Sequence, residues 1–262
     1  SVVLLFIAYN FWGHNFEGIL NHGYIDYNHF IDIMIFGLDG ILGLPIRVAA
    51  SYAFLFVLFG AVLHKAKGGE FFFDLAASIS GKQVGGVAKI AVVSSGLYGM
   101  VSGSPTSDVV TTGSITIPMM KRTGFRPETA AGIETAASTG GQIMPPVMGA
   151  SAFLIVEFTG ISYWDIVRVS IIPAALYFFS VYALVHFESR KLGLVGLPKD
   201  QVPRVGPIMK EGWFYLLPPI IIIVVLMTGR PVPYAGLYGI GSVIILAALK
   251  GGLVLLKKAR EE

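Results

Sequence analysis

Long apolar runs fill most of the chain, and short polar stretches separate them. Six runs lack both Lys and Arg: residues 48–64, 90–120, 127–167, 169–189, 213–229 and 231–249. A helix needs about 20 residues to cross a bilayer, so four of these runs are predicted to span it once each, the first with residues 41–46 added. The runs 90–120 and 127–167 do not fit a single span and need a different explanation.

Composition supports a membrane location. The 262 residues are 54% hydrophobic and 13% charged, with a mean hydropathy of +0.72, which is too little charge to coat a water-soluble globule. The net charge is +3, but Lys and Arg lie in short clusters between apolar runs, so nucleic-acid binding is not indicated. Cysteine is absent, which excludes disulfides and thiolate chemistry. The predicted fold class is an all-α, multi-span integral membrane protein.

The positive charges predict an orientation. If Lys65 and Lys67 are cytoplasmic, crossing the membrane run by run leaves only three of the 19 Lys and Arg residues on the outer side. These three are Arg47, Arg168 and Arg230. Such a bias is typical of the positive-inside rule. It holds only if the segment between Lys89 and Lys121 enters and leaves the membrane on the same face.

The stretch VSGSPTSDVV, residues 101–110, interrupts the second run. The arms on its two sides, 90–101 and 109–120, are each about 18 Å long as helices, against a hydrocarbon core of about 30 Å. The stretch is therefore predicted to form the tip of a re-entrant helical hairpin. Polar backbone at this depth is tolerated where it lines a cavity, which favours a binding site at the tip.

The same polar residues also have a purely structural interpretation. Ser104 can cap the second arm with Pro105 at its first position, or Ser107 can cap it one turn later. Asp108 complements the N-terminal helix dipole in either case. Capping alone therefore stays open beside the binding site.

A second interruption, ETAASTGGQIMPPVMGASAF, covers residues 134–153. The glycine pair 140–141 lacks side chains and the proline pair 145–146 lacks backbone donors, so a helix broken at about half depth is predicted. Two broken segments at similar depth provide free carbonyls for a cation and free amides for an anion. Close helix packing is an alternative role for the glycines, although it does not account for the prolines.

Three carboxylates within the apolar runs, Asp108, Glu134 and Glu157, are candidate proton carriers. For Glu134 and Glu157, a capped, interfacial or paired carboxylate is the favoured interpretation. A proton-coupled transporter stays open as an alternative, and so does an ion channel, because re-entrant loops also build selectivity filters. An enzyme is not expected, because the five His residues fall at predicted interfaces or near the N-terminus, away from the serines of the tip.

The segment SGSPTSDVVTTGSITIPMMKRTGFRPETAAGIETAASTGGQIMPPVMGASAF resembles the large membrane subunit of tripartite ATP-independent periplasmic (TRAP) transporters. More narrowly, it is similar to fused permeases that work with a TAXI-type binding protein, and the similarity runs from about residue 41 to 192. The resemblance implies the first half of an inverted-repeat, elevator-type secondary transporter. Only one hairpin and one break with paired glycines and prolines occur, so the second repeat is expected to be missing and the chain to be part of a longer protein.

The resemblance also implies a sodium site, with sodium-coupled uptake of an organic acid and no organic cofactor. The candidate sodium and substrate residues are Ser102, Gly103, Ser104, Ser107, Asp108, Ser138, Thr139, Gly140, Gly141 and Gln142. Hydroxyl, carbonyl and carboxylate oxygens suit hard cations. The implied partners are an extracytoplasmic substrate-binding protein, a small membrane subunit or its fused equivalent, the remainder of the large subunit and the lipid bilayer. The implied location is the cytoplasmic (inner) membrane of a bacterium or archaeon.

These elements predict an order of segments along the chain. Residues 1–43 are expected to hold the end of a preceding helix and an interfacial amphipathic connector. Residues 44–190 form the first repeat, which is followed by a cytoplasmic loop over 191–211 and by two further spanning helices with a basic tail over 212–262. Within the first repeat, the hairpin covers about 83–121 and the broken helix about 127–158.

Overall fold

The computed structural model describes residues 2–37 and 40–261, and of residues 250–261 it describes the backbone only. All regular structure in these residues is helical. The chain divides into two compact units, Ser1–Ala50 and Ser51–Glu262, which are described separately below.

The first unit consists of short helices. These are α1 (Val2–Trp12), η1 (Gly13–Asn15), η2 (Gly18–Leu20), α2 (Tyr27–Ile31), the π-helical η3 (Asp32–Phe36) and α3 (Leu44–Val48). Asp26 caps α2, because its carboxylate accepts a hydrogen bond from the backbone N–H of Asn28 at 3.1 Å. The predicted amphipathic connector is thus helical in part, and its residues 38 and 39 lie outside the described residues.

Among the described residues, four helical segments are long and apolar enough to cross a membrane, and they overlap the four predicted spans. They are Leu44–Lys65, Tyr163–Lys191, Val205–Met227 and Val232–Leu249. The first span comprises α3, η4 (Ala49–Ala53) and α4 (Phe54–Lys65), and the second is α11 (Tyr163–Lys191). The third comprises α12 (Val205–Gly212), η6 (Trp213–Leu216) and α13 (Leu217–Met227). The fourth is the first part of α14 (Val232–Glu261). Length and composition therefore agree with an integral membrane protein.

The third span begins earlier than the sequence predicts. Residues 205–211, expected in the loop, form α12 and continue into the span. Pro207 does not prevent this, because it lies in the first turn, where its missing N–H leaves no helical bond unmade.

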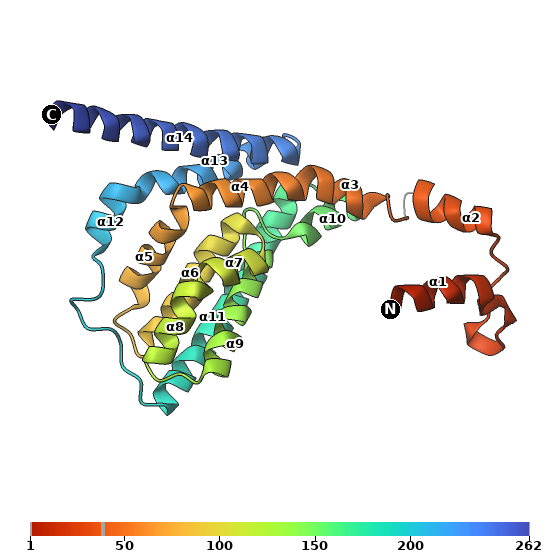
Figure 1. Cartoon of the computed structure of the whole chain (residues 1–262), viewed down its shortest axis with the longest axis horizontal. Helices are drawn as coiled ribbons and strands as arrows, with labels where there is room; N and C mark the ends of the chain where they lie inside the picture. Colours follow the sequence, from red (N-terminus) through yellow and green to blue (C-terminus); the bar gives the residue numbers. More distant parts are fainter. Residues whose placement is uncertain (1, 38–39, 262) are drawn as a thin grey trace. The chain divides into compact units, whose positions relative to one another are not determined.

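The remaining helices of the second unit lie between the spans. They are α5 (Gly68–Ser80), α6 (Gly86–Ser102), α7 (Pro105–Thr111), α8 (Gly113–Arg122), α9 (Pro127–Gly140), η5 (Gly141–Ile143) and α10 (Ala150–Thr159). In Figure 1, α7 and α8 run back along α6, so that this segment returns to the end of the bundle from which it started. Helix α6 begins at Gly86 and has 17 residues, which makes the first arm longer than the 12 residues inferred from charge.

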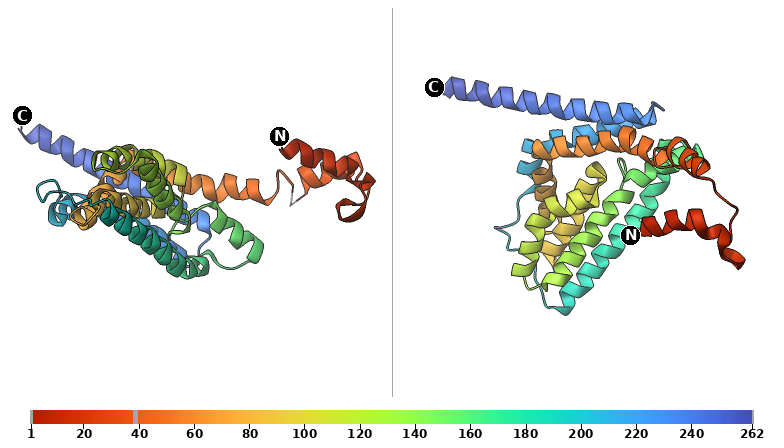
Figure 2. Two further views of the ribbon diagram at one scale, coloured as in Figure 1. Left: turned by 90° about the horizontal axis from the view of Figure 1, so that it is seen from below. Right: turned by 45° about the vertical axis from the view of Figure 1, so that its right-hand side comes forward.

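The second unit has two packed groups of helices. Helices α4, α13 and α14 lie side by side, and α5, α6, α8, α9 and α11 form a bundle beneath them (Figures 1 and 2). An apolar cluster fills the bundle near the ends of α8 and α11. Its fully buried members include Ala88, Val92, Met120, Ala130, Ala137 and Val185. Small residues dominate this list, which permits the close approach of α6 and α9.

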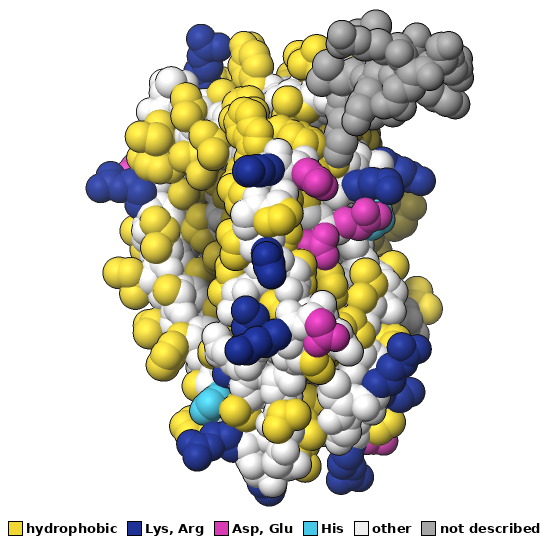
Figure 3. Space-filling view, turned by 90° about the vertical axis from the view of Figure 1, so that its left-hand side faces the viewer, with side chains coloured by type: hydrophobic (Ala, Val, Ile, Leu, Met, Phe, Trp, Pro, Cys, Tyr) yellow, Lys and Arg dark blue, Asp and Glu magenta, His cyan; other side chains and the backbone are white. Residues whose placement is uncertain are grey.

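Basic side chains gather at one end of the bundle. The start of α6, the end of α8, the start of α9 and the end of α11 lie together in Figure 1, and the sequence places its Lys and Arg clusters at these ends. The face shown in Figure 3 carries many Lys and Arg side chains and fewer acidic ones.

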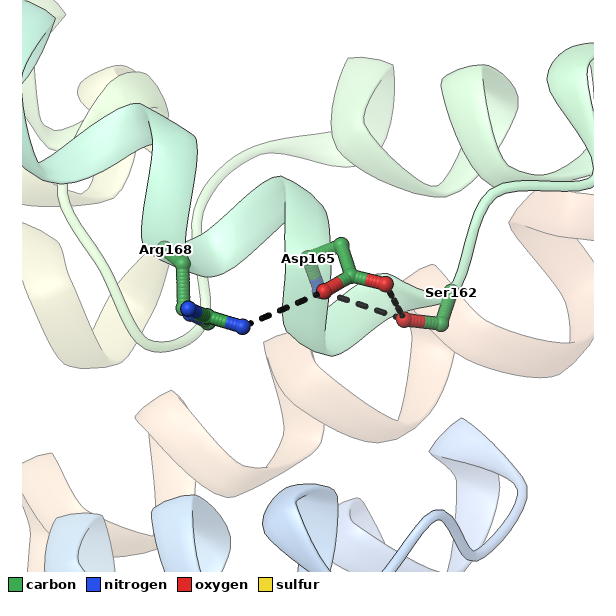
Figure 4. A network of polar contacts seen from close by, with 3 residues as sticks. All are labelled: Ser162, Asp165 and Arg168. Atoms are coloured by element: carbon green, nitrogen blue, oxygen red, sulfur yellow. Dashed lines mark hydrogen bonds and ion pairs between the residues drawn. The ribbon is translucent and has the colours of Figure 1, made fainter.

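The other end of α11 is capped by its own side chains (Figure 4). The Ser162 hydroxyl accepts the backbone N–H of Asp165 at 3.2 Å and donates to the Asp165 carboxylate at 2.6 Å. Arg168 lies 3.6 Å from the same carboxylate. These exposed groups begin the helix at the position where Trp164 and Asp165 indicate a membrane interface.

Candidate functional site

The polar tip between α6 and α7 is a compact turn. Helix α6 ends at Ser102, and Gly103 follows in the left-handed region with φ +59°. Ser104 caps α7 by accepting the backbone N–H of Ser107 at 3.4 Å, and Pro105 occupies the first helical position. The first of the two predicted capping arrangements is therefore confirmed.

Asp108 does more than complement the helix dipole. It lies in the first turn of α7 and is fully buried. The Ser102 hydroxyl donates a hydrogen bond to Asp108 Oδ1, and the backbone N–H of Ser104 donates to the Ser102 hydroxyl at 3.2 Å. The second carboxylate oxygen, Oδ2, has no hydrogen-bond partner among the described residues. A buried carboxylate oxygen without a partner is costly unless a ligand satisfies it.

The broken helix meets the tip at this oxygen. A Cβ atom added to Gly141 would lie 2.8 Å from Gly99 Cα and 2.9 Å from Asp108 Oδ2, and one added to Gly99 would lie 2.6 Å from Gly141 Cα. The two glycines thus leave room for the carboxylate between α6 and the break. A Cβ on Gly103 would lie 2.0 Å from the Met148 carbonyl oxygen. The segment around Met148, which follows the proline pair, therefore also packs against the tip.

A cavity of about 280 Å³ opens beside the tip and the break. Ser102, Ser104, Gln142 and Ser151 supply its polar groups, and aromatic rings, among them Phe153, line its apolar side. None of the described residues that line it is charged. The two interruptions predicted from separate parts of the sequence therefore border one cavity.

The other candidate residues of the broken helix lie apart from the tip. Ser138 is fully buried and faces Glu134, with Oγ 3.4 Å from the Glu134 carboxylate. Thr139 is exposed, and its hydroxyl donates to the Thr135 carbonyl at 2.7 Å. Gly140 packs against the rings of Tyr177 and its neighbour Phe178. Of the ten candidates, the structure brings together Ser102, Gly103, Ser104, Asp108, Gly141 and Gln142.

The break is held by Tyr163 at the start of α11. Its hydroxyl donates to the carbonyl oxygens of Val147 and, at 3.2 Å, of Pro146. The Tyr163 ring stacks on Phe153 with centroids 5.1 Å apart, and Phe153 stacks on Phe56 of α4 at 5.3 Å. This aromatic row positions the break against the tip. Sequence inspection missed Tyr163, because only the fold brings it to the break.

Glu134 is the second feature that sequence reasoning underestimated. It lies within α9 and is fully buried. Four hydroxyls surround its carboxylate: those of Ser95, Thr112, Thr116 and Ser138. No Lys, Arg or His among the described residues forms an ion pair with it. Glu157, by contrast, is partly exposed and accepts a hydrogen bond from Tyr52 at 2.7 Å.

Apolar spans around broken helices with a buried polar centre are the arrangement found in secondary transporters. Residues 2–261 match the family described as the tripartite ATP-independent periplasmic transporter, DctM component, and the chain belongs to this family. The match confirms the resemblance at the level of the family and extends it over nearly the whole chain. The family is one of inner-membrane transporter permeases, so the expectation that the chain is not an enzyme is confirmed as well.

Individual relatives are distant. The chain is 26% identical over 211 residues to the sialic acid TRAP transporter large permease protein SiaM of Vibrio cholerae, a match that covers 78% of this chain and 49% of the relative. It is 26% identical over 200 residues to the C4-dicarboxylate TRAP transporter large permease protein DctM of Pseudomonas aeruginosa, a match that covers 73% of this chain and 46% of the relative. It is 23% identical over 169 residues to the 2,3-diketo-L-gulonate TRAP transporter large permease protein YiaN of Escherichia coli, a match that covers 64% of this chain and 39% of the relative. The chain thus spans about half of the length of these relatives or less.

Proposed function

We propose that the chain is a functional part of the large permease of a secondary active transporter, which takes up an organic acid together with sodium. The observation that carries this proposal is the unpartnered Asp108 Oδ2, buried where the tip meets the broken helix. A sodium ion at this point would neutralise the carboxylate and join the two elements. In this proposal α6, α7 and α8 form a re-entrant hairpin that moves with α9 and α10 in an elevator-type transport cycle.

The groups around Asp108 suit a sodium ion. Sodium is a hard cation that takes hydroxyl, carbonyl and carboxylate oxygens, and discontinuous membrane helices supply such oxygens from side chains and free backbone. The Ser102 hydroxyl lies beside the carboxylate, Ser104 lines the adjoining cavity, and Gly141 brings backbone close to the carboxylate. One carboxylate balances one positive charge, which fits a monovalent ion.

The cavity next to this ion is the proposed substrate site. Three relatives are named for sialic acid, C4-dicarboxylates and 2,3-diketo-L-gulonate, all of which are organic acids. The cavity offers hydroxyl and amide groups but no positive side chain, so the bound cation would supply the attraction for the substrate carboxylate. An extracytoplasmic binding protein, of the TAXI type in our proposal, would deliver the acid, and a small membrane subunit would accompany the permease. An ion channel is not favoured, because the site is enclosed between two different broken elements.

Sodium-dependent uptake by the complete transporter tests the ion site. Ser104→Ala and Asp108→Asn are expected to raise the sodium concentration needed for half-maximal uptake, because each removes an oxygen or the charge that would hold the ion. Thr139→Ala is the matched control, because Thr139 lies nearby in sequence but its side chain is exposed and lies apart from the tip. Uptake that a proton gradient drives equally well without sodium, in wild type and variants alike, would refute the assignment.

Cysteine labelling tests the hairpin, and these 262 residues contain no cysteine that would react in the background. Lys82→Cys before α6 and Arg122→Cys at the end of α8 are expected to react with a membrane-impermeant reagent from the same, cytoplasmic side. Thr159→Cys at the end of α10 is expected to react from the outside. All three positions are exposed. Labelling of the first two positions from opposite sides would exclude a re-entrant hairpin.

A further inference from the structure

The carboxylate of Glu134 lies in a pocket made of hydroxyl groups from three helices. Ser95 of α6 approaches Glu134 Oε1 at 3.0 Å, Thr112 at the junction of α7 and α8 donates to the same oxygen, and Thr116 of α8 donates to Oε2. Ser138, one turn further along α9, completes the group. All five side chains are at most 3% exposed. We name these five residues the Glu134 cluster.

A carboxylate in such surroundings needs a positive charge. Burial of an ionised group is unfavourable unless a countercharge accompanies it, and an ionisable group at membrane depth indicates a functional site by default. The three ion pairs of the described residues all lie on the surface and none includes Glu134. Hydroxyl groups alone stabilise the carboxylate but do not balance its charge.

The hydroxyl groups are arranged so that their lone pairs can turn towards a cation. Thr112 Oγ1 lies 2.8 Å from the Asp108 carbonyl oxygen, and Thr116 Oγ1 lies 3.0 Å from the Thr112 carbonyl oxygen. Each threonine can therefore give its single hydrogen to a helix carbonyl and present an oxygen to an ion instead. Ser94, the neighbour of Ser95, already bonds the carbonyl of Ala91 in this way at 3.2 Å.

From this geometry we infer that the Glu134 cluster is a second binding site for a monovalent cation, separate from the site at the tip. One carboxylate balances one charge, and four hydroxyl oxygens with two carboxylate oxygens form an all-oxygen ligand set. A divalent ion is disfavoured because it would leave one charge uncompensated, and no group of three His, Asp or Glu side chains that could hold a metal ion occurs in the described part of the chain. Sodium is the ion of the proposed transport cycle, so the inference rests on that proposal for the identity of the ion.

A cavity borders the cluster at Thr112. A cavity of about 420 Å³ between the α4–α5 turn and the α7–α8 segment has Thr112 in its wall, and Thr112 also contacts Glu134. The rim carries Lys65 and Lys67 together with Glu70, and Lys67 lies 3.9 Å from Glu70. These rim charges are exposed, so salt screens their effect on an approaching cation.

The two proposed cation sites would be linked through one short segment. The Asp108 side chain faces the tip, while its carbonyl oxygen lies 2.8 Å from the Thr112 hydroxyl of the Glu134 cluster. A cation in the cluster would therefore stabilise α7 against α9, and α7 presents Asp108 to the other ion. The binding of each ion would favour the binding of the other.

The test measures the binding of radiolabelled sodium to the purified, detergent-solubilised permease at constant ionic strength. Wild type is expected to bind two ions per chain. Glu134→Gln and Thr116→Val are each expected to lower this stoichiometry about twofold, because they remove the charge or one ligand of the cluster. Ser104→Ala is expected to remove the other ion and leave the cluster occupied. Glu157→Gln is the matched control, because this carboxylate is also hydrogen-bonded but lies outside the cluster.

Thermal unfolding of the same samples controls for misfolding. Glu134→Gln removes a buried charge and keeps the shape of the side chain, so it is expected to be at least as stable as wild type without sodium and to gain less from added sodium. Unchanged stoichiometry in Glu134→Gln and Thr116→Val, with loss of an ion in Ser104→Ala, would overturn this inference and leave the proposed function intact. Loss of an ion only in the cluster variants would support the inference and refute the tip site. Wild type that binds no sodium would overturn both sites.

Discussion

Replacement of Gly141 by alanine tests the close contact between α6 and the broken helix. The added Cβ would lie 2.8 Å from Gly99 Cα and 2.9 Å from Asp108 Oδ2. Ordinary contact begins at 3.4 Å, and Gly99 Cα is backbone that cannot rotate away. The two elements must therefore move apart, and overpacking of this kind typically costs about 1–3 kcal/mol.

The matched control is Gly132→Ala in the same region of the chain. Gly132 lies in α9, and a Cβ added there meets nothing within 4 Å. Alanine in place of glycine in an open helix position stabilises by about 0.5–1 kcal/mol. The same chemical change is thus expected to have opposite signs at two positions only nine residues apart.

Thermal unfolding of the purified permease in detergent measures both variants. Gly141→Ala is expected to lower Tm by about 2–12 °C, since 1 kcal/mol corresponds to about 2–4 °C for a chain of this size. It is also expected to weaken sodium binding, because the Cβ displaces Asp108 Oδ2. Equal Tm values for Gly141→Ala and Gly132→Ala would show that the break does not approach α6 in this way.

Two further predictions concern the support of the site, and a third concerns a buried residue far from it. Gly103→Ala is expected to lower stability by about 1–3 kcal/mol, because its positive φ and the nearby Met148 carbonyl both exclude a Cβ, and thermal unfolding measures this loss. Tyr163→Phe is expected to cost about 1–3 kcal/mol and to slow uptake, because it leaves the buried Val147 carbonyl without its donor; uptake equal to wild type would argue against a role of the break. Lys89→Met is expected to reduce the melting temperature without changing the sodium requirement, because this 2% exposed ammonium group makes two hydrogen bonds far from the tip.

Local signals in the sequence were sufficient to predict the helices, the turn and the break that make up the site. The four spans follow from run length and hydropathy, because a bilayer requires a minimum apolar length whatever the neighbouring helices are. The turn at Ser104 and Pro105 follows from capping preferences, and the break follows from the glycine and proline pairs. Each of these features depends on residues within one or two helical turns.

Local sequence signals did not predict which way each side chain points. Thr139 and Ser138 are adjacent in the sequence, but one is exposed and the other faces Glu134. Residues 205–211 read as a loop because of Pro207 and their charges, but they continue into a spanning helix. Helix propensity and composition do not determine which face of a helix packs against another element.

The sequence by itself thus determined that this is a multi-span membrane protein of the TRAP permease family, with two polar interruptions in its apolar runs. Only the tertiary structure decided that Gly99 and Gly141 enclose the free oxygen of Asp108, and that hydroxyls from α6, α8 and α9 surround Glu134. The reason is physical. Hydropathy and backbone preference act along the chain, whereas a ligand set is built from side chains that meet only when separate helices pack together.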